Sequence, residues 1–250
     1  ETPPMEHCLD SVEALLRQLA TQLAHGADGA LELEARLGYI NPADCSFRPG
    51  VPPAVFDRLL RAFELNDSWA ATTDFAESRD VAHRCRTGDR LVRTTTGPDG
   101  VTHCVKTVLG RAALCATGQR VTAAGSALDV RVSLAREELV LSRDLPAHAC
   151  PEWVRVKQRR SFTWGAWRWD FTRVWQAATF LEADAAVATQ PPLLEVELEL
   201  ARPGAYLGDA SPGRTPRHAA ESLLLKLHDM LAPLADDPTL AYYPPEHFTQ

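Results

Sequence analysis

The feature of this sequence that most constrains its fold is a run of glutamates alternating with aliphatic residues. Over residues 193–200, Glu195, Glu197 and Glu199 alternate with leucine and valine, the period of a β-strand with one charged and one apolar face. Carboxylates at this spacing lie ~6.6 Å apart on one face. At an effective dielectric of ~20, each neighbouring pair repels by roughly 2–3 kcal/mol before salt screening. Folding alone does not require such a face, and a bound cation would offset the repulsion.

Three other stretches show the same alternation, and their polar faces are mostly charged. The residues on these polar faces are Glu32, Glu34 and Arg36 over 31–38, Arg155, Lys157 and Arg159 over 152–163, and Arg168, Asp170 and Thr172 over 167–175. The commonest meaning of such alternation is an antiparallel sheet with a solvated polar face. The segregation of acidic and basic residues favours instead an enclosed face. There, carboxylates would bind a hard cation, and arginine and lysine would bind phosphate oxygens.

Short alternating stretches separated by turn residues dominate the middle of the chain, which is typical of an antiparallel sheet or barrel. The candidate strands are 31–38, 76–83, 90–96, 101–108, 127–135, 152–163, 167–175 and 193–200. Helical spacing of apolar residues predicts helices over about 6–25, after Pro52 and Pro53, and over about 216–234. We therefore predict an α+β fold: an eight-stranded antiparallel β-barrel with flanking helices. It would form one domain over residues 1–250, with barrel strands over about 29–200, charges facing inward and apolar residues facing outward.

Loop lengths between candidate strands predict which side chains share the inner face. A four-residue loop over 97–100 sets Arg93 opposite Cys104, and therefore on the face of Lys106. An even-numbered loop at Trp164 and Gly165 would set Arg159 opposite Asp170. The strand over 127–135 presents Asp129, Arg131 and Ser133 on one face, and Glu137 continues that parity.

Composition excludes several other classes of protein. The net charge of −7 argues against a protein that coats nucleic acid through bulk charge, so any phosphate site must be a local cluster. No run of about 18 apolar residues predicts a membrane-spanning helix. The six cysteines form no C-x-x-C motif, and we expect reduced thiols in an intracellular protein. Phosphate-binding loop, dinucleotide-binding and H-E-x-x-H motifs are absent.

Tryptophans at 164, 167, 169 and 175 leave two interpretations open. They could form a platform for stacking nucleic-acid bases. The favoured interpretation is an outer apolar layer beneath a helix.

Four segments together resemble the fungal and protozoan mRNA 5′-triphosphatases, which belong to the triphosphate tunnel metalloenzymes. The segments are ELEARLG at 32–38, RVKQR at 155–159, RWDFT at 168–172 and EVELE at 195–199. The resemblance covers about residues 29–200, and its strength comes from all four segments occurring in this order. It implies an eight-stranded tunnel and Mn²⁺- or Mg²⁺-dependent removal of the γ-phosphate from triphosphate-ended RNA, the first step of cap formation.

The resemblance also implies roles for individual residues. Metal ligands would be Glu32, Glu34 and Glu199; phosphate contacts would come from Arg93, Lys106, Arg131, Arg155, Lys157, Arg159 and Arg168. Asp170, Thr172 and, as a weaker match, Asp80 would orient these basic residues. Glu195 and Glu197 would complete the acidic side, and either Glu137 or Glu197 would position the attacking water.

Other substrates and partners remain open in this interpretation. The same fold could hydrolyse tripolyphosphate, a nucleoside triphosphate or another small triphosphate, or bind polyphosphate without turnover. The capping role implies a nuclear location, and we expect no membrane association. The absence of a tryptophan-rich segment before the first barrel strand argues against a tight guanylyltransferase complex. A monomer is slightly favoured, although the sequence does not fix the oligomeric state.

Overall fold

The computed structural model describes residues 4–26, 31–41, 43–84, 90–114, 128–141, 150–208 and 214–234. Its helices are α1 (Pro4–Ala24), α2 (Pro53–Leu65), α3 (Phe180–Thr189), α4 (Pro203–Leu207) and α5 (Pro216–Leu231), followed by a 3₁₀ turn over Ala232–Leu234. Its strands are β1 (Leu31–Ile40), β2 (Phe47–Pro49), β3 (Ala71–Thr72), β4 (Ala76–Arg84), β5 (Leu91–Gly97), β6 (Gly100–Leu114), β7 (Asp129–Leu139), β8 (Trp153–Trp164), β9 (Trp167–Ala177) and β10 (Leu193–Leu200).

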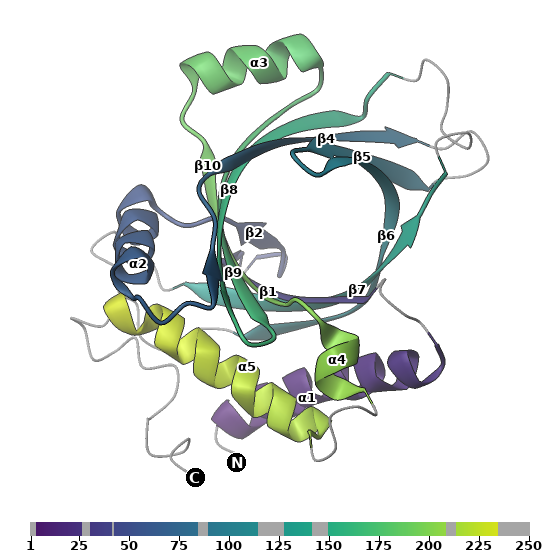
Figure 1. The fold of residues 1–250 in the computed structure, drawn as a ribbon, viewed down its shortest axis with the longest axis vertical. Helices are drawn as coiled ribbons and strands as arrows, with labels where there is room; N and C mark the ends of the chain where they lie inside the picture. Colours follow the sequence, from purple (N-terminus) through teal and green to yellow (C-terminus); the bar gives the residue numbers. More distant parts are fainter. Residues whose placement is uncertain are drawn as a thin grey trace.

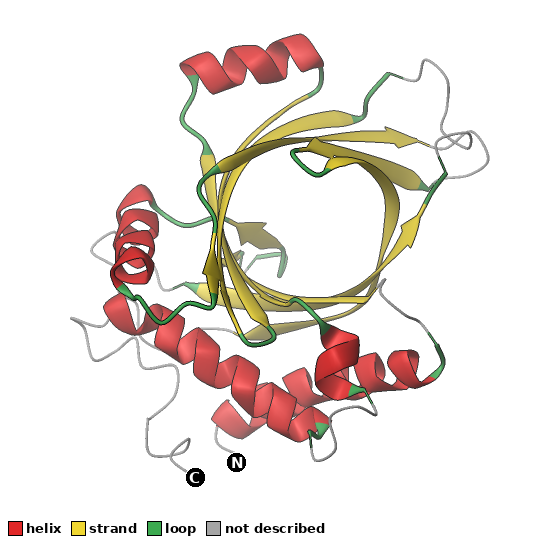
Figure 2. Ribbon diagram, viewed as in Figure 1, coloured by secondary structure: helices red, strands yellow, loops and turns green. Residues whose placement is uncertain are grey.

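Eight of these strands close into an antiparallel barrel, which Figures 1 and 2 show end-on. Hydrogen-bonded neighbours follow the order β10-β9-β8-β4-β5-β6-β7-β1, and the pairing of β1 with β10 closes the ring. The short strands β2 and β3 add to β1 and β8. The predicted eight-stranded barrel with flanking helices is therefore confirmed, and each of the eight candidate stretches overlaps one barrel strand.

The apolar residues of the barrel face outward beneath the helices. Leu33 and Leu37 of β1, Leu198 of β10 and Phe171 of β9 are all fully buried in one core with residues of α1, α2 and α5. Figure 2 shows these three helices against the outside of one half of the barrel, while α3 covers a separate part. The hydrophobic layer thus lies between barrel and helices, and the barrel interior is left to the opposite, charged faces of the strands.

Turn chemistry explains one difference from the sequence prediction. We expected Arg159 opposite Asp170, but the structure pairs Arg159 with Thr172 and Ser161 with Asp170. The loop does contain two residues, Gly165 and Ala166, because Trp164 pairs with Trp167. Gly165 has φ = 61°, a conformation that suits glycine at the first central position of a tight hairpin turn. The register therefore shifts by one pair while every side chain keeps its predicted face.

A local contact also explains where helix α5 begins. The side chain of Thr215 accepts a hydrogen bond from the backbone N–H of His218, which caps α5 as the Thr-Pro pair predicts.

Four of the six cysteines lie among the described residues, and no disulfide joins any of these four to another. Within the described part of the chain, no helix is both long and apolar enough to cross a membrane.

Candidate active site

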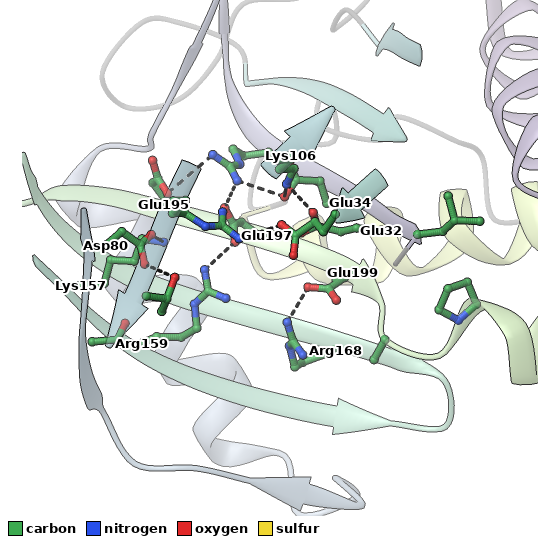
Figure 3. A pocket seen from close by; sticks show the side chains of 18 of the residues that line it. Glu32, Glu34, Asp80, Lys106, Lys157, Arg159, Arg168, Glu195, Glu197 and Glu199 are labelled. Atoms are coloured by element: carbon green, nitrogen blue, oxygen red, sulfur yellow. Dashed lines mark hydrogen bonds and ion pairs between the residues drawn. The ribbon is translucent and has the colours of Figure 1, made fainter. Parts of the chain in front are cut away.

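A cavity of about 630 Å³ lies inside the barrel, and Figure 3 shows many of the side chains that line it. Its lining includes seven carboxylates and eight cationic side chains. The carboxylates are Glu32, Glu34, Asp80, Glu137, Glu195, Glu197 and Glu199; the cations are Arg36, Arg93, Lys106, Arg155, Lys157, Arg159, Arg168 and Arg202. They come from all eight barrel strands and from the segment that leads into α4, so the fold places charges distant in sequence around one space.

The acidic side of the cavity is formed where β1 and β10 close the barrel. Glu34 pairs in register with Glu199, and Arg36 pairs with Glu197. Leu33 and Leu198 are their neighbours in the chain, on the opposite face of the strands, and both are fully buried in the outer core. The outward burial of these leucines therefore fixes the glutamates inward, because a slip of one residue would exchange the two faces.

Arg36 neutralises much of this acidic side. Its Nη2 lies 3.0 Å from Oε2 of Glu34 and 2.5 Å from Oε1 of Glu197. A longer contact of 3.8 Å joins its Nη1 to Oε2 of Glu195. The repulsion that the sequence predicts among the three glutamates of β10 is thus partly offset within the protein, by an arginine of the neighbouring strand.

A buried carboxylate on β9 organises the basic side. Asp170 has no exposed surface, and its Oδ2 lies 2.9 Å from Nη1 of Arg159. The Nε of Arg168 donates to both Asp170 oxygens at 3.1 Å, and the Ser161 hydroxyl donates to Oδ1 at 2.6 Å. Thr172 accepts a further bond of 3.1 Å from Nε of Arg159. Asp170 and Thr172 therefore hold the two guanidinium groups in fixed positions at the cavity wall.

Two of these arginines also reach across to β10. Nη2 of Arg159 donates to Oε2 of Glu197 at 3.0 Å, and Nη2 of Arg168 contacts Oε2 of Glu199 at 2.5 Å. The acidic and basic sides are consequently joined into one network, as the dashed lines in Figure 3 show.

Three further cations that line the cavity are also paired with carboxylates. Lys157 of β8 forms an ion pair with Asp80 of β4, whose Oδ1 accepts a 2.8 Å bond from the hydroxyl of Thr95. Nη2 of Arg93 lies 2.7 Å from Oε1 of Glu137. Lys106 forms an ion pair with Glu32 and lies 3.8 Å from Glu34.

Glu197 and Glu199 of β10 differ in their pKa values. Burial alone would raise the pKa of Glu197, but Arg36 and Arg159 outweigh it and lower that pKa to about 2. Burial raises the pKa of Glu199 to about 7, against the lowering effect of Arg168 and with a further increase from Glu32. Glu197 is therefore a permanent carboxylate at neutral pH.

The charged form of Lys157 is disfavoured by its surroundings, although Lys157 is paired with Asp80. Burial lowers the pKa of Lys157, and the nearby Arg159 and Arg93 lower it further, so that Asp80 does not restore it. The pKa of Asp80 is itself lowered, because Lys157 and Thr95 overcome the effect of its burial. An anion bound beside Lys157 would stabilise its charged form.

Thirteen of the sixteen residues singled out from the sequence line the cavity. Asp170 and Thr172 lie behind the wall and contact its arginines. Arg131 is outside this set, since its guanidinium lies over the ring of Phe47 at 4.6 Å from the centroid. Sequence reasoning did not single out Thr95, Ser78 and Arg202, which also line the cavity. The strand parity that identifies Arg93 and Asp80 could have revealed Thr95 and Ser78.

The donor chemistry of the acidic side fits a hard divalent cation. Glu32, Glu34 and Glu199 offer carboxylate oxygens on two adjacent strands, which is the ligand type that Mg²⁺ and Mn²⁺ prefer. The buried Oε1 of Glu195 has no hydrogen-bond partner. Among the described residues, however, no three acidic, histidine or cysteine side chains converge as a metal cluster. Each candidate ligand is paired with Lys106, Arg36 or Arg168 instead.

Comparison of the fold with solved structures finds RNA triphosphatases. The structure is similar to the Pct1 RNA triphosphatase of S. pombe, with a TM-score of 0.63 and 16% identity over 89% of this chain and 92% of that one. It is also similar to the RNA triphosphatase domain of the mimivirus mRNA capping enzyme, with a TM-score of 0.55 and 13% identity over 87% and 96% of the two chains. No protein-family model and no curated protein matches the sequence. At these identities the comparison shows that the chain shares the fold of the RNA triphosphatases.

Proposed function

We propose that this chain is a divalent-metal-dependent polynucleotide 5′-phosphatase that removes the γ-phosphate from triphosphate-ended RNA. The observation that carries the proposal is the barrel cavity, in which Glu34 faces Glu199 on one wall and Arg159, Lys157 and Arg93 occupy the others. Cationic side chains that could bind a triphosphate and carboxylates that could bind its metal ion line the same space, which supports the proposal. The fold shared with two RNA triphosphatases supports the same activity.

In this proposal the basic walls bind the phosphate chain. Arg159 and Arg168 present guanidinium groups already oriented by Asp170, so that little ordering remains when phosphate oxygens bind. Burial and neighbouring cations lower the pKa of Lys157, so a bound phosphate would add a second anionic partner to Asp80 and stabilise the charged lysine. Arg93, Lys106 and Arg155 extend the basic surface along the cavity.

The acidic wall is proposed to hold one Mn²⁺ or Mg²⁺ ion through Glu32, Glu34 and Glu199. Such an ion supplies Lewis-acid stabilisation of the charge on the transferred phosphoryl group and orients the triphosphate. Entry of an anion gives Lys106 and Arg168 alternative partners, which frees Glu32 and Glu199 from the ion pairs they make in this structure.

Hydrolysis requires a water aligned with the bond between the γ-phosphorus and its bridging oxygen. Attack forms a new phosphorus–oxygen bond, the bridging bond breaks, and orthophosphate and a diphosphate-ended RNA result. We assign the orientation of this water to Glu197 or Glu137. Glu197, a carboxylate held by Arg36 and Arg159, accepts a hydrogen bond from water but is a weak base, because its pKa is about 2. This restricts it to orienting the water.

Removal of the metal tests the proposal. Phosphate release from triphosphate-ended RNA should disappear in EDTA and return with Mn²⁺ or Mg²⁺. Parallel assays with tripolyphosphate and ATP establish the substrate: preferential use of RNA supports a capping function and the nuclear location that it implies. Preferential use of tripolyphosphate would replace that function with a small-triphosphate hydrolase. Retained binding of tripolyphosphate without any phosphate release would leave a non-catalytic binding barrel.

A further inference from the structure

A second cavity, of about 500 Å³, lies at the mouth of the barrel beside the first. The two cavities share Arg202 and Ala205, so that the rim of one is the wall of the other. The tip of the β8–β9 hairpin, residues 164–167, also lines the second cavity. Thr163, the residue before Trp164, pairs in register with the cavity-lining Arg168. Trp164 therefore lies just beyond the end of the charged interior.

The lining of this second cavity is basic and aromatic. Its aromatic side chains are Trp164, Trp167 and Tyr206, and its cationic side chains are Arg202, Arg214 and Lys226. No carboxylate lines it among the described residues, although the chain carries a net charge of −7. Three cationic side chains beside three aromatic rings are a local departure from the charge of the whole protein, and they favour an anionic, stackable ligand.

Trp164 differs from the other tryptophans of this region. Trp167, Trp169 and Trp175 are buried, whereas Trp164 is 53% exposed at the end of a well-paired hairpin. The ammonium group of Lys226 lies 5.5 Å from the centroid of its ring. Of the two interpretations of the tryptophan cluster, the outer apolar layer therefore describes Trp167, Trp169 and Trp175, and Trp164 is available for stacking.

The cations near Trp164 are held in place by the fold. Lys226 donates a 3.0 Å hydrogen bond to the hydroxyl of Ser222, one helical turn earlier on α5. The guanidinium of Arg214 lies over the ring of Tyr206, at 4.4 Å from its centroid. Both positive charges therefore border the same cavity from defined positions.

We propose that this second cavity binds the 5′-terminal nucleotide of a single-stranded RNA whose 5′-triphosphate occupies the barrel. A base stacks on Trp164, and Arg214 and Lys226 contact the phosphates that follow it. The proposal rests on the function proposed above and specifies the part of the substrate beyond the triphosphate. Stacking on an exposed aromatic ring flanked by cations is the usual means of binding single strands without sequence preference.

Comparison of two substrates tests the proposal. Trp164→Ala should raise the KM for a short triphosphate-ended RNA roughly ten-fold, because one base loses its stacking partner. The KM for inorganic tripolyphosphate, which has no base, should stay unchanged, and Trp164→Phe should restore most of the RNA affinity. Arg214→Ala should weaken RNA binding and lower the slope of log affinity against log salt by about 0.7.

Matched controls lie on the outer surface. Phe180→Ala removes a half-exposed aromatic ring of α3, and Arg61→Ala removes an exposed cation of α2; neither should change the KM for RNA. An equal rise in KM for RNA and tripolyphosphate in Trp164→Ala, or no rise for either, would overturn the proposal.

A binding measurement separates this proposal from the proposed function. Fluorescence anisotropy with 5′-hydroxyl RNA needs no hydrolysis, so it reports on the second cavity even if the chain hydrolyses nothing. Weaker binding by Trp164→Ala supports the cavity as an RNA site. Equal binding by Trp164→Ala and the unmodified protein overturns it.

Discussion

The chemistry of the cavity depends on individual carboxylates that orient cations without facing the cavity themselves. Asp170 is fully buried and contacts Arg159, Arg168 and Ser161, so its charge is compensated on every side. A buried carboxylate with one missing partner would be costly, since the uncompensated charge remains desolvated. Asp170 is therefore a positioning residue, and the groups it positions are those proposed to bind phosphate.

The role proposed for Glu199 gives a test at a single side chain. Glu199→Ala removes a carboxylate opposite Glu34 and should lower RNA phosphatase turnover about 100-fold or more, because the proposed metal loses a ligand. Arg168 keeps Asp170 as a partner, so the thermal unfolding midpoint should change little. Phosphate release and circular dichroism melting measure the two effects.

A control for this variant lies on the outside of the barrel. Glu138 of β7 pairs with the exposed Arg90, and Glu138→Ala should leave turnover unchanged. Full turnover by Glu199→Ala would contradict its assignment as a metal ligand.

The elements depend on the apolar layer between the barrel and its helices. Trp169 of β9 is 5% exposed and contacts Phe63 of α2 and Trp69, with ring centroids 6.0 and 5.1 Å apart. Trp169→Ala should lower the free energy of unfolding by about 3–5 kcal/mol through lost burial and the cavity left behind. Chemical denaturation measures this change.

Two comparisons make the Trp169 test specific. Leu65 lies on α2, as Phe63 does, but is 80% exposed. Leu65→Ala should change the free energy of unfolding by less than about 0.5 kcal/mol. Because Trp169 faces away from the cavity, turnover by the folded Trp169→Ala protein should equal that of the unmodified chain. A loss of turnover without a loss of stability would place Trp169 on the inner face.

Elements with a clear apolar period were predictable from the sequence, and elements without one were not. Alternation identified all eight barrel strands, and Thr215 with Pro216 identified the start of α5. Helix α3 was missed, because its alanine-rich sequence lacks a clear apolar stripe, although Thr179 and Glu182 form a capping box that signals its start. The strands β2 and β3 were missed because two or three residues show no period.

The membership of the site was more predictable than its pairings. Strand parity placed Arg159, Lys157 and Glu197 on the inner face, and the structure brings them to one cavity. The sequence did not predict that Arg36 would bridge Glu34 and Glu197, because that contact depends on the register in which β1 and β10 close the barrel. Such a register joins strands more than 150 residues apart and leaves no local pattern.

On the scale of the whole molecule, the barrel encloses a network of charge in a space that an anion can enter. A ligand that binds only the folded chain stabilises it, by about 2.7 kcal/mol at a concentration 100 times its Kd. For a chain of this length, that energy corresponds to a rise of roughly 5–11 °C in the unfolding midpoint. Tripolyphosphate in EDTA, which prevents metal-dependent turnover, should therefore raise the midpoint by several degrees in differential scanning calorimetry.

Two adjacent arginines of β8 make this measurement specific to the interior. Arg159 lines the cavity, whereas Arg160 points outward and pairs with Glu64 of α2. Arg159→Gln should abolish most of the tripolyphosphate-dependent rise, and Arg160→Gln should retain it, because only the first removes a cation from the barrel interior. The comparison uses the ligand-dependent rise of each variant, so that differences in basal stability cancel. An equal rise in both variants would mean that the anion binds outside the barrel, and the enclosed cavity would lose its proposed role in triphosphate binding.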